Sequence, residues 1–155
     1  MDLFRVCAIT YDVESKCSHL YFIGGEVKCV SLDPKSILDR MCMLKGSSMQ
    51  GRMDACKYVL QIQRKVPVLV SRCLECIFFP INGFMVEDNI WLQYKYIQKV
   101  KSVTTSKCIV YFVDGSELLV PVGCRVVYKQ LQRCKKFFSV ITSGLDSREI
   151  IGEEV

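Results

Sequence analysis

The chain has 155 residues, half of them hydrophobic, which is enough for the buried core of one domain and excludes wholesale disorder. Its formal net charge is +5, but residues 34–145 carry 17 Lys and Arg against 7 Asp and Glu. The first 33 residues carry 3 against 5, and the last ten carry 1 against 4. A basic body of this kind predicts a polyanionic partner, most commonly nucleic acid, although an acidic membrane surface or an acidic protein attracts the same charge.

The most apolar stretch, residues 76–86, is interrupted by Pro80, Asn82 and Gly83. It is shorter than the roughly 20 residues that span a bilayer. The N-terminus has an acidic residue at position 2 and lacks the apolar segment of a secretory signal. We therefore expect a cytoplasmic protein that does not enter a membrane.

Alternation, turn residues and helix caps together predict the secondary structure. In chain order, the predicted elements are a strand over 3–11, a hairpin around the glycines at 24–25, a helix over 34–45, a loop with a short helical turn and then a strand over 57–63, strands over 66–71 and 75–81, a strand over 90–103, a hairpin around 114–115, and a helix over 124–142. Asp33 as the N-cap and Pro34 in the first turn set the start of the first helix.

These elements predict a single α+β domain over residues 1–145 with a mostly antiparallel sheet, which could close into a barrel. We find no internal repeat in the sequence. Residues 146–155 are acidic and are expected to form a flexible tail.

Ten cysteines are many for a cytoplasmic domain, but most lie inside apolar patterns and are interpreted as reduced, buried thiols. Cys73 and Cys76 have the spacing of half a zinc site or of a redox pair. The chain has one histidine, His19, and no second close cysteine pair, so two small apolar residues near a turn remain the simpler interpretation and we expect no metal or other cofactor. With one imidazole and few acidic residues in its body, the chain is not expected to be an enzyme.

The C-terminal helix predicts an amphipathic element with one basic side. At about 100° per residue, one stripe holds the basic residues Arg125, Lys129, Arg133 and Lys136. The apolar stripe on the other side holds Val127, Leu131, Cys134, Phe138 and Ile141. A solvated outer face is the alternative, but such faces usually mix both signs of charge, so this helix is a candidate for contacting phosphates.

Two further groups of basic residues are candidates for the same interface. Along the strand over 90–103, alternation places Lys95, Lys99 and Lys101 on one side, where they either follow a nucleic-acid backbone or protect a sheet edge from self-pairing. The other group, Lys45, Arg52, Lys57, Arg64 and Lys65, surrounds the loop GSSMQGR at 46–52. Its glycines permit close approach of the backbone to another surface, and its serines and amides can bind phosphate oxygens.

Several segments resemble the ComK-type competence transcription factors. The most specific are GSSMQGR within ILDRMCMLKGSSMQGR at 37–52 and the ending CIFFP of VPVLVSRCLECIFFP at 66–80. The strand IWLQYKYIQKVK and the hairpin IVYFVDGSELLVPV with its basic helix follow in the same order. The resemblance covers about two thirds of the chain.

The resemblance implies a transcriptional activator that binds A·T-rich double-stranded DNA, largely through the minor groove, as a homo-oligomer. It also implies contact with the transcription machinery, while the short acidic C-terminus puts control by a proteolytic adaptor in doubt. A narrow A·T minor groove attracts arginine, and Arg52 is the residue we expect in it. Gly46, Ser47, Ser48 and Gly51 would form its scaffold, with the basic residues of the last helix on phosphates.

A second hypothesis stays open. A small β-rich domain with a C-terminal helix is similar in outline to pleckstrin-homology folds. In that case, the basic surface would bind acidic lipids or proteins instead of DNA.

Overall fold

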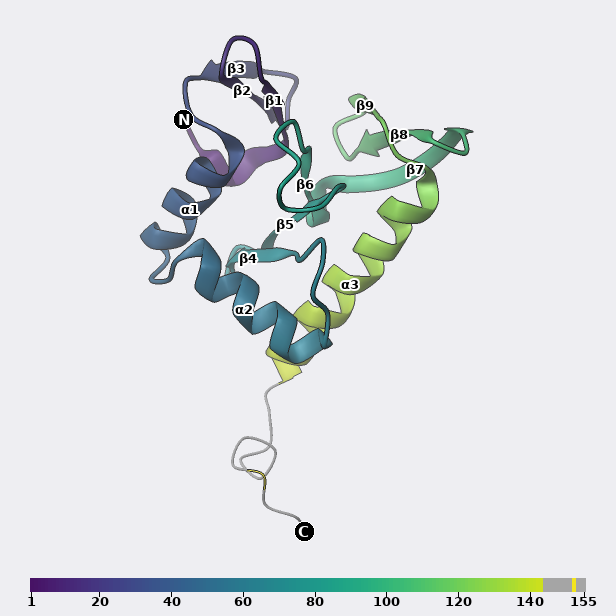
Figure 1. The fold of residues 1–155 in the computed structure, drawn as a ribbon. Helices are drawn as coiled ribbons and strands as arrows, with labels where there is room; N and C mark the ends of the chain where they lie inside the picture. The colour runs from purple at the N-terminus through teal and green to yellow at the C-terminus, as the bar shows by residue number, and fades with distance from the viewer. Residues whose placement is uncertain (144–151, 153–155) are drawn as a thin grey trace.

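The computed structural model describes residues 1–143 and Gly152, and within them it confirms the predicted α+β class with mostly antiparallel sheet (Figure 1). In chain order the elements are η1 (Leu3–Arg5), β1 (Val6–Asp12), β2 (Cys17–Phe22), β3 (Val27–Val30), α1 (Pro34–Leu44), α2 (Met49–Leu60), β4 (Val68–Ser71), β5 (Cys76–Pro80), β6 (Trp91–Gln93), η2 (Tyr94–Tyr96), β7 (Ile97–Thr104), β8 (Lys107–Phe112), β9 (Glu117–Val120) and α3 (Cys124–Ser143). Apart from Gly152, the predicted tail over 146–155 lies outside the described residues.

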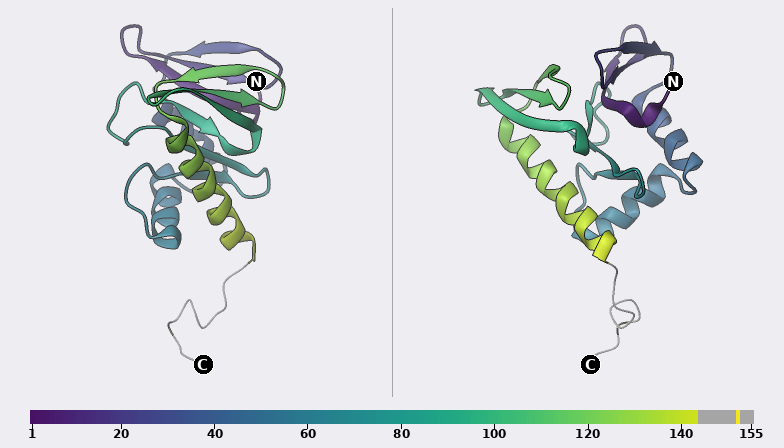
Figure 2. Two further views of the ribbon diagram at one scale, coloured as in Figure 1. Left: turned by 90° about the vertical axis from the view of Figure 1, so that its right-hand side faces the viewer. Right: turned by 180° about the vertical axis from the view of Figure 1, so that it is seen from behind.

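Six strands form the larger sheet, in the order β3-β2-β1-β6-β5-β4. In its β4–β6 half, α1 and α2 pack on one side and α3 on the other, so helices cover both faces (Figure 2). This explains why every residue of β5 is buried and why its sequence CIFFP is continuously apolar. The buried apolar side chains of the described residues form one core cluster, which extends from this layer to buried residues of β7, β8 and β9.

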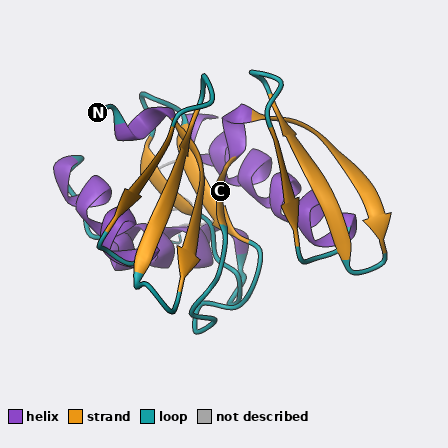
Figure 3. Ribbon diagram, turned by 90° about the horizontal axis from the view of Figure 1, so that it is seen from above, coloured by secondary structure: helices purple, strands orange, loops and turns teal. Residues whose placement is uncertain are grey.

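A separate sheet contains β7, β8 and β9, and Figure 3 shows the two sheets side by side. The single strand predicted over 90–103 is therefore wrong, because the chain leaves the first sheet at Gln93 and enters the second at Ile97. Gln93 is fully buried, and its Nε2 donates to the carbonyl oxygens of Val6 (2.6 Å) and Phe4 (3.2 Å). This fixed amide holds the end of β6, and η2 redirects the chain. The described strands form two open sheets and no closed barrel.

Helix α2 replaces the loop and the strand over 57–63 that the sequence predicted. Ser48 is its N-cap and accepts a hydrogen bond from Gly51 N at 3.0 Å, so Gly51 lies in the first helical turn. Its buried residues Met49, Met53 and Cys56 are spaced by four and three, which is a helical pattern. The glycines and serines at its start obscured that pattern.

The described residues contain an internal repeat, contrary to the sequence analysis. A 3₁₀ turn, three antiparallel strands and a helix occur as η1-β1-β2-β3-α1 and again as η2-β7-β8-β9-α3. The first two strands of each unit share a register irregularity after their first pair, which is Val6 with Phe22 in one unit and Ile97 with Phe112 in the other.

The turns of the two units are also equivalent. Phe22 N donates to Glu26 O at 2.8 Å, and Phe112 N donates to Ser116 O at 2.9 Å. Gly24 of the first turn donates its N–H to Asp114 Oδ2 of the second at 2.8 Å, so equivalent positions of the two units contact each other. Few residues are identical at equivalent positions of the two units, and for this reason the repeat cannot be recognised in the sequence.

Burial divides the ten free cysteines into reactivity classes. The buried ones are Cys7, Cys42, Cys56, Cys76, Cys108 and Cys134. Desolvation raises the pKa of Cys7, Cys56 and Cys76 to about 12, so these thiols stay protonated near neutral pH.

We expect a thiol-alkylating reagent at pH 8 to label the exposed Cys29 and Cys73 first, and the six buried cysteines only after unfolding in urea. Peptide mass spectrometry of samples taken over time gives the order of labelling. Rapid labelling of Cys56 in the native protein would contradict this packing.

Candidate nucleic-acid interface

Helix α3 is amphipathic, as predicted, and runs beneath the second sheet (Figure 2). Its fully buried residues are Val127, Gln130, Cys134 and Phe137. The predicted residues Leu131, Phe138 and Ile141 are only partly buried, so the buried stripe is rotated from the predicted one and includes a polar residue. None of the helices in the described part of the chain is both long and apolar enough to cross a membrane.

A hollow of about 340 Å³ lies beside α3, where the helix meets the segment between α2 and β4. Five predicted cations line it, together with Val126 and Gln130, and we call these five the basic groove: Arg64, Lys65, Arg125, Lys129 and Arg133. They come from two segments about 60 residues apart in the sequence, which the fold brings together. Every charged residue that lines this hollow in the described part of the chain is positive.

Hydrogen bonds to backbone carbonyls hold the two walls of the basic groove together. The Gln130 side chain is 1% exposed, and its Nε2 donates to Lys65 O at 2.8 Å and to Pro80 O at 2.7 Å. Arg133 Nη1 donates to Arg64 O at 2.9 Å. The two walls of the groove are therefore held in a fixed arrangement, because one buried amide joins α3, the 61–67 segment and the end of β5.

The cations of the groove are not neutralised within the described residues. The ion pair found there is between Lys28 and Glu26, at 3.3 Å, on β3 and its turn. Positive side chains held close together without carboxylates repel one another, and a polyanion relieves that repulsion. Arginine forks and lysine ammonium groups are the side chains that contact phosphate oxygens most strongly.

The lysines predicted on one strand separate into two places. Lys99 and Lys101 lie on exposed positions of β7, paired with Tyr111 and Ile109 of β8, and the Lys99 ammonium lies 4.9 Å from the Tyr111 ring centroid. The neighbouring residue Val100 is buried in the core cluster on the face of β7 that packs against α3, and its carbonyl accepts from Tyr128 Oη at 3.0 Å. These two lysines therefore lie on the side of the sheet away from α3.

Lys95 does not join Lys99 and Lys101. It lies in η2, and its Nζ donates to Leu74 O at 2.6 Å.

The segment GSSMQGR forms the corner between α1 and α2 instead of an open loop. Gly46 has a φ of +95°, which ends α1, and Ser47 precedes the cap at Ser48. Arg52 Nη2 donates to Lys45 O at 3.2 Å, so the guanidinium caps the C-terminal end of α1. The ammonium of Lys45 lies 5.0 Å from the Phe4 ring centroid.

Within this corner, Arg52, Ser48 and Gly51 all support local structure, and insertion of Arg52 into a groove stays a prediction. Lys57 lies in the last turn of α2 and is half-buried. It does not line the basic groove.

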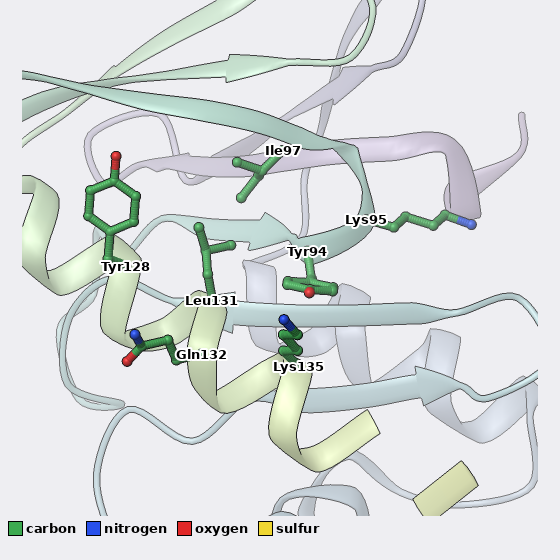
Figure 4. Close-up of a pocket in the computed structure, with 7 residues that line it drawn as sticks. All are labelled: Tyr94, Lys95, Ile97, Tyr128, Leu131, Gln132 and Lys135. Carbon is green, nitrogen blue, oxygen red and sulfur yellow. The ribbon is translucent and has the colours of Figure 1, made fainter. Parts of the chain in front are cut away.

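Lys135 is a residue that the sequence analysis did not include. It lines a second hollow of about 440 Å³ on the other side of α3, which we call the aromatic pocket (Figure 4). Its lining residues are Tyr94, Lys95, Ile97, Tyr128, Leu131, Gln132 and Lys135. The helical spacing of 128, 131, 132 and 135 could have indicated a common side. Lys136 lines an adjoining hollow with Gln132, Lys135, Ser139 and Val140.

Cys73 and Cys76, which have the spacing of half a zinc site, lie in different environments. Cys76 is buried in β5 with its pKa raised to about 12 by desolvation, whereas Cys73 is exposed in the preceding turn. No group of three metal-ligating side chains is present within residues 1–143 and Gly152. His19 lies on β2 between Thr10 and Cys29 of the neighbouring strands.

We expect Gln130→Ala to lower the free energy of unfolding by about 1–3 kcal/mol, because it leaves the carbonyl of Pro80 without its donor and the carbonyl of Lys65 with only the 3.4 Å bond from Arg133 Nη1. Urea unfolding measures the change. Gln132→Ala, on the exposed side of the same helix, is the control and should change stability little. Equal stability of the two variants would contradict the role of Gln130.

Comparison with known proteins gives two matches. The model of a protein family described as ComK protein matches residues 6–144. Over 119 residues the chain is 25% identical to the competence transcription factor of Bacillus subtilis (strain 168). The alignment covers 77% of this chain and 62% of that protein, so the chain spans less than two thirds of its relative. No solved structure matches.

Proposed function

Because the chain belongs to the ComK protein family, we propose that it is a competence-type transcriptional regulator that binds duplex DNA through the basic groove. The relative from Bacillus subtilis is by its name a competence transcription factor. The observation that carries the proposal is the convergence, on one hollow beside α3, of five cations that form no ion pair with any described residue. This function requires no catalytic group.

The dimensions of the basic side of α3 suit a duplex. From Arg125 to Lys136 the helix advances about 16 Å, and that length of B-DNA carries about ten phosphates. Lys136 extends the stripe beyond the basic groove. Contacts to phosphates position the protein on the DNA backbone and do not distinguish one base sequence from another.

We further propose a preference for A·T-rich sites, read through the width of the minor groove. Narrow A·T tracts have an enhanced negative potential that attracts arginine, and three of the five groove cations are arginines. Arg52 is the fourth candidate for this role. Self-association and contacts with other proteins of transcription belong to the same proposal.

The first test is a salt titration with A·T-rich and G·C-rich duplexes. If five cations each neutralise one phosphate, the logarithm of the association constant should fall with the logarithm of salt concentration with a slope of about −4.5. The A·T-rich duplex should bind more tightly at every salt concentration. Binding to anionic vesicles without binding to either duplex would contradict the proposal and favour a lipid-binding module.

We expect Lys129→Ala to weaken both duplexes equally and to reduce the magnitude of the salt slope by about 1, because it removes one phosphate contact. Fluorescence anisotropy across salt concentrations measures both quantities. Lys28→Ala is the matched control, since Lys28 lies on β3 beside Glu26 and outside the groove. If the two variants bind alike, the basic groove is not the DNA surface.

Arg52→Ala separates two roles of one side chain. If Arg52 lies in the minor groove, its truncation should reduce the preference of the protein for A·T-rich DNA. If Arg52 only caps α1, its truncation should destabilise the fold and leave that preference unchanged. We expect a reduced ratio of A·T to G·C affinity, measured at a temperature where circular dichroism shows the variant folded. An unchanged ratio would remove Arg52 from the DNA interface.

A further inference from the structure

The turn between β5 and β6 exposes three consecutive apolar residues. Phe84, Met85 and Val86 are 37%, 86% and 38% exposed, and the exposed acids Glu87 and Asp88 follow them. Runs of exposed apolar residues are rare on a free surface and indicate an interaction site.

Buried hydrogen bonds hold this turn in shape. Asn89 is 2% exposed; its Oδ1 accepts from Asn82 N at 3.0 Å, and its Nδ2 donates to Asn82 O at 2.9 Å and to Gly83 O at 3.0 Å. The ammonium of Lys35 lies 3.7 Å from the Phe84 ring centroid. The turn therefore presents Met85 as a fixed apolar tip, which lowers the entropy that binding would cost.

The aromatic pocket has the complementary character. Ile97, Leu131 and Tyr94 supply apolar surface, and Figure 4 shows Lys135 extending from α3 toward Tyr94, while Lys95 points away. Among the residues that the structure describes, no acidic one lines the pocket. The adjoining hollow adds Lys136, so two lysines lie next to an apolar opening.

We propose that the 84–88 turn of one copy of this chain binds in the aromatic pocket of a second copy. Met85 would enter the pocket, where a thioether packs well against tyrosine rings. Glu87 and Asp88 would lie beside Lys135, so acidic side chains of one copy meet a basic side chain of the other. The contact joins two different surfaces, so each copy keeps one free turn and one free pocket and the assembly grows head to tail.

Both the pocket and the basic groove use α3, but on different sides. Arg125, Lys129 and Arg133 line the groove, whereas Tyr128, Leu131 and Lys135 line the pocket. On a helix with about 100° per residue these two sets point well away from each other. A second copy in the pocket therefore leaves the groove open. The inference names a surface for the self-association that the proposed function includes, but it does not depend on DNA binding.

The test is sedimentation velocity over a range of protein concentrations, without DNA. We expect the wild-type mass to rise with concentration. Met85→Ser and Lys135→Glu should each weaken association about tenfold or more. Leu44→Ser is the matched control, because Leu44 is 79% exposed at the end of α1 and belongs to neither surface.

Mixing the two defective variants makes the test specific to a head-to-tail contact. Met85→Ser keeps an intact pocket and Lys135→Glu keeps an intact turn, so an equimolar mixture should form dimers and nothing larger. Glu87→Lys should also partly restore association of Lys135→Glu, because it restores opposite charges across the contact.

Three results would overturn the proposal. The wild type could remain monomeric at every concentration, or both variants could associate as tightly as Leu44→Ser. In the third, removal of residues 146–155 changes association while Met85→Ser does not, which would make the acidic C-terminal segment the occupant of the pocket. Duplex affinity of Met85→Ser, measured separately, shows whether DNA binding persists in each case.

Discussion

The buried side-chain amide of Gln130 is the interaction on which the candidate interface depends. It joins α3, the 61–67 segment and the end of β5 through two short hydrogen bonds to carbonyl oxygens. A buried amide is costly unless its partners are present, so these three segments are held in one arrangement. That arrangement brings Arg64 and Lys65 against the basic side of α3. Burial of one polar group thus fixes the position of five charged ones.

The two repeat units differ in charge, because residues 3–44 carry five basic and five acidic side chains whereas residues 94–143 carry nine basic and two acidic ones. The strand positions of Lys99 and Lys101 correspond to Ala8 and Thr10 in the first unit, as judged from their pairing with β8 and β2. Both helices start at matching positions, Pro34 and Cys124, so Lys129 corresponds to Asp39.

Asp39 supports the fold, because its Oδ1 accepts from Met49 N at 2.9 Å at the start of α2. The first unit therefore contributes to the core layer. The second supplies three of the five groove cations, Arg125, Lys129 and Arg133, and a positive surface of that kind favours a polyanion.

Local signals in the sequence were sufficient to predict most of the helices and strands. Asp33 and Pro34 mark the start of α1, Asp114 and Gly115 mark the turn between β8 and β9, and the apolar spacing of the last helix marks α3. Each of these depends on hydrogen bonds or periodicity within a few residues. The basic stripe of α3 could be read for the same reason, because a helix places residues three and four apart on one side.

Long-range contacts decided the rest. The break between β6 and β7 depends on Gln93, whose partners Val6 and Phe4 lie almost ninety residues earlier. The separation of Lys95 from Lys99, the role of Arg52 at the corner of α1 and α2, and the meeting of residues 64–65 with α3 all arise from packing between distant segments. By itself, the sequence determined which residues are charged and which short segments form helices and strands, because those properties are local. Only the tertiary structure decided which cations share a surface, because that depends on how buried amides and apolar side chains bring remote parts of the chain together.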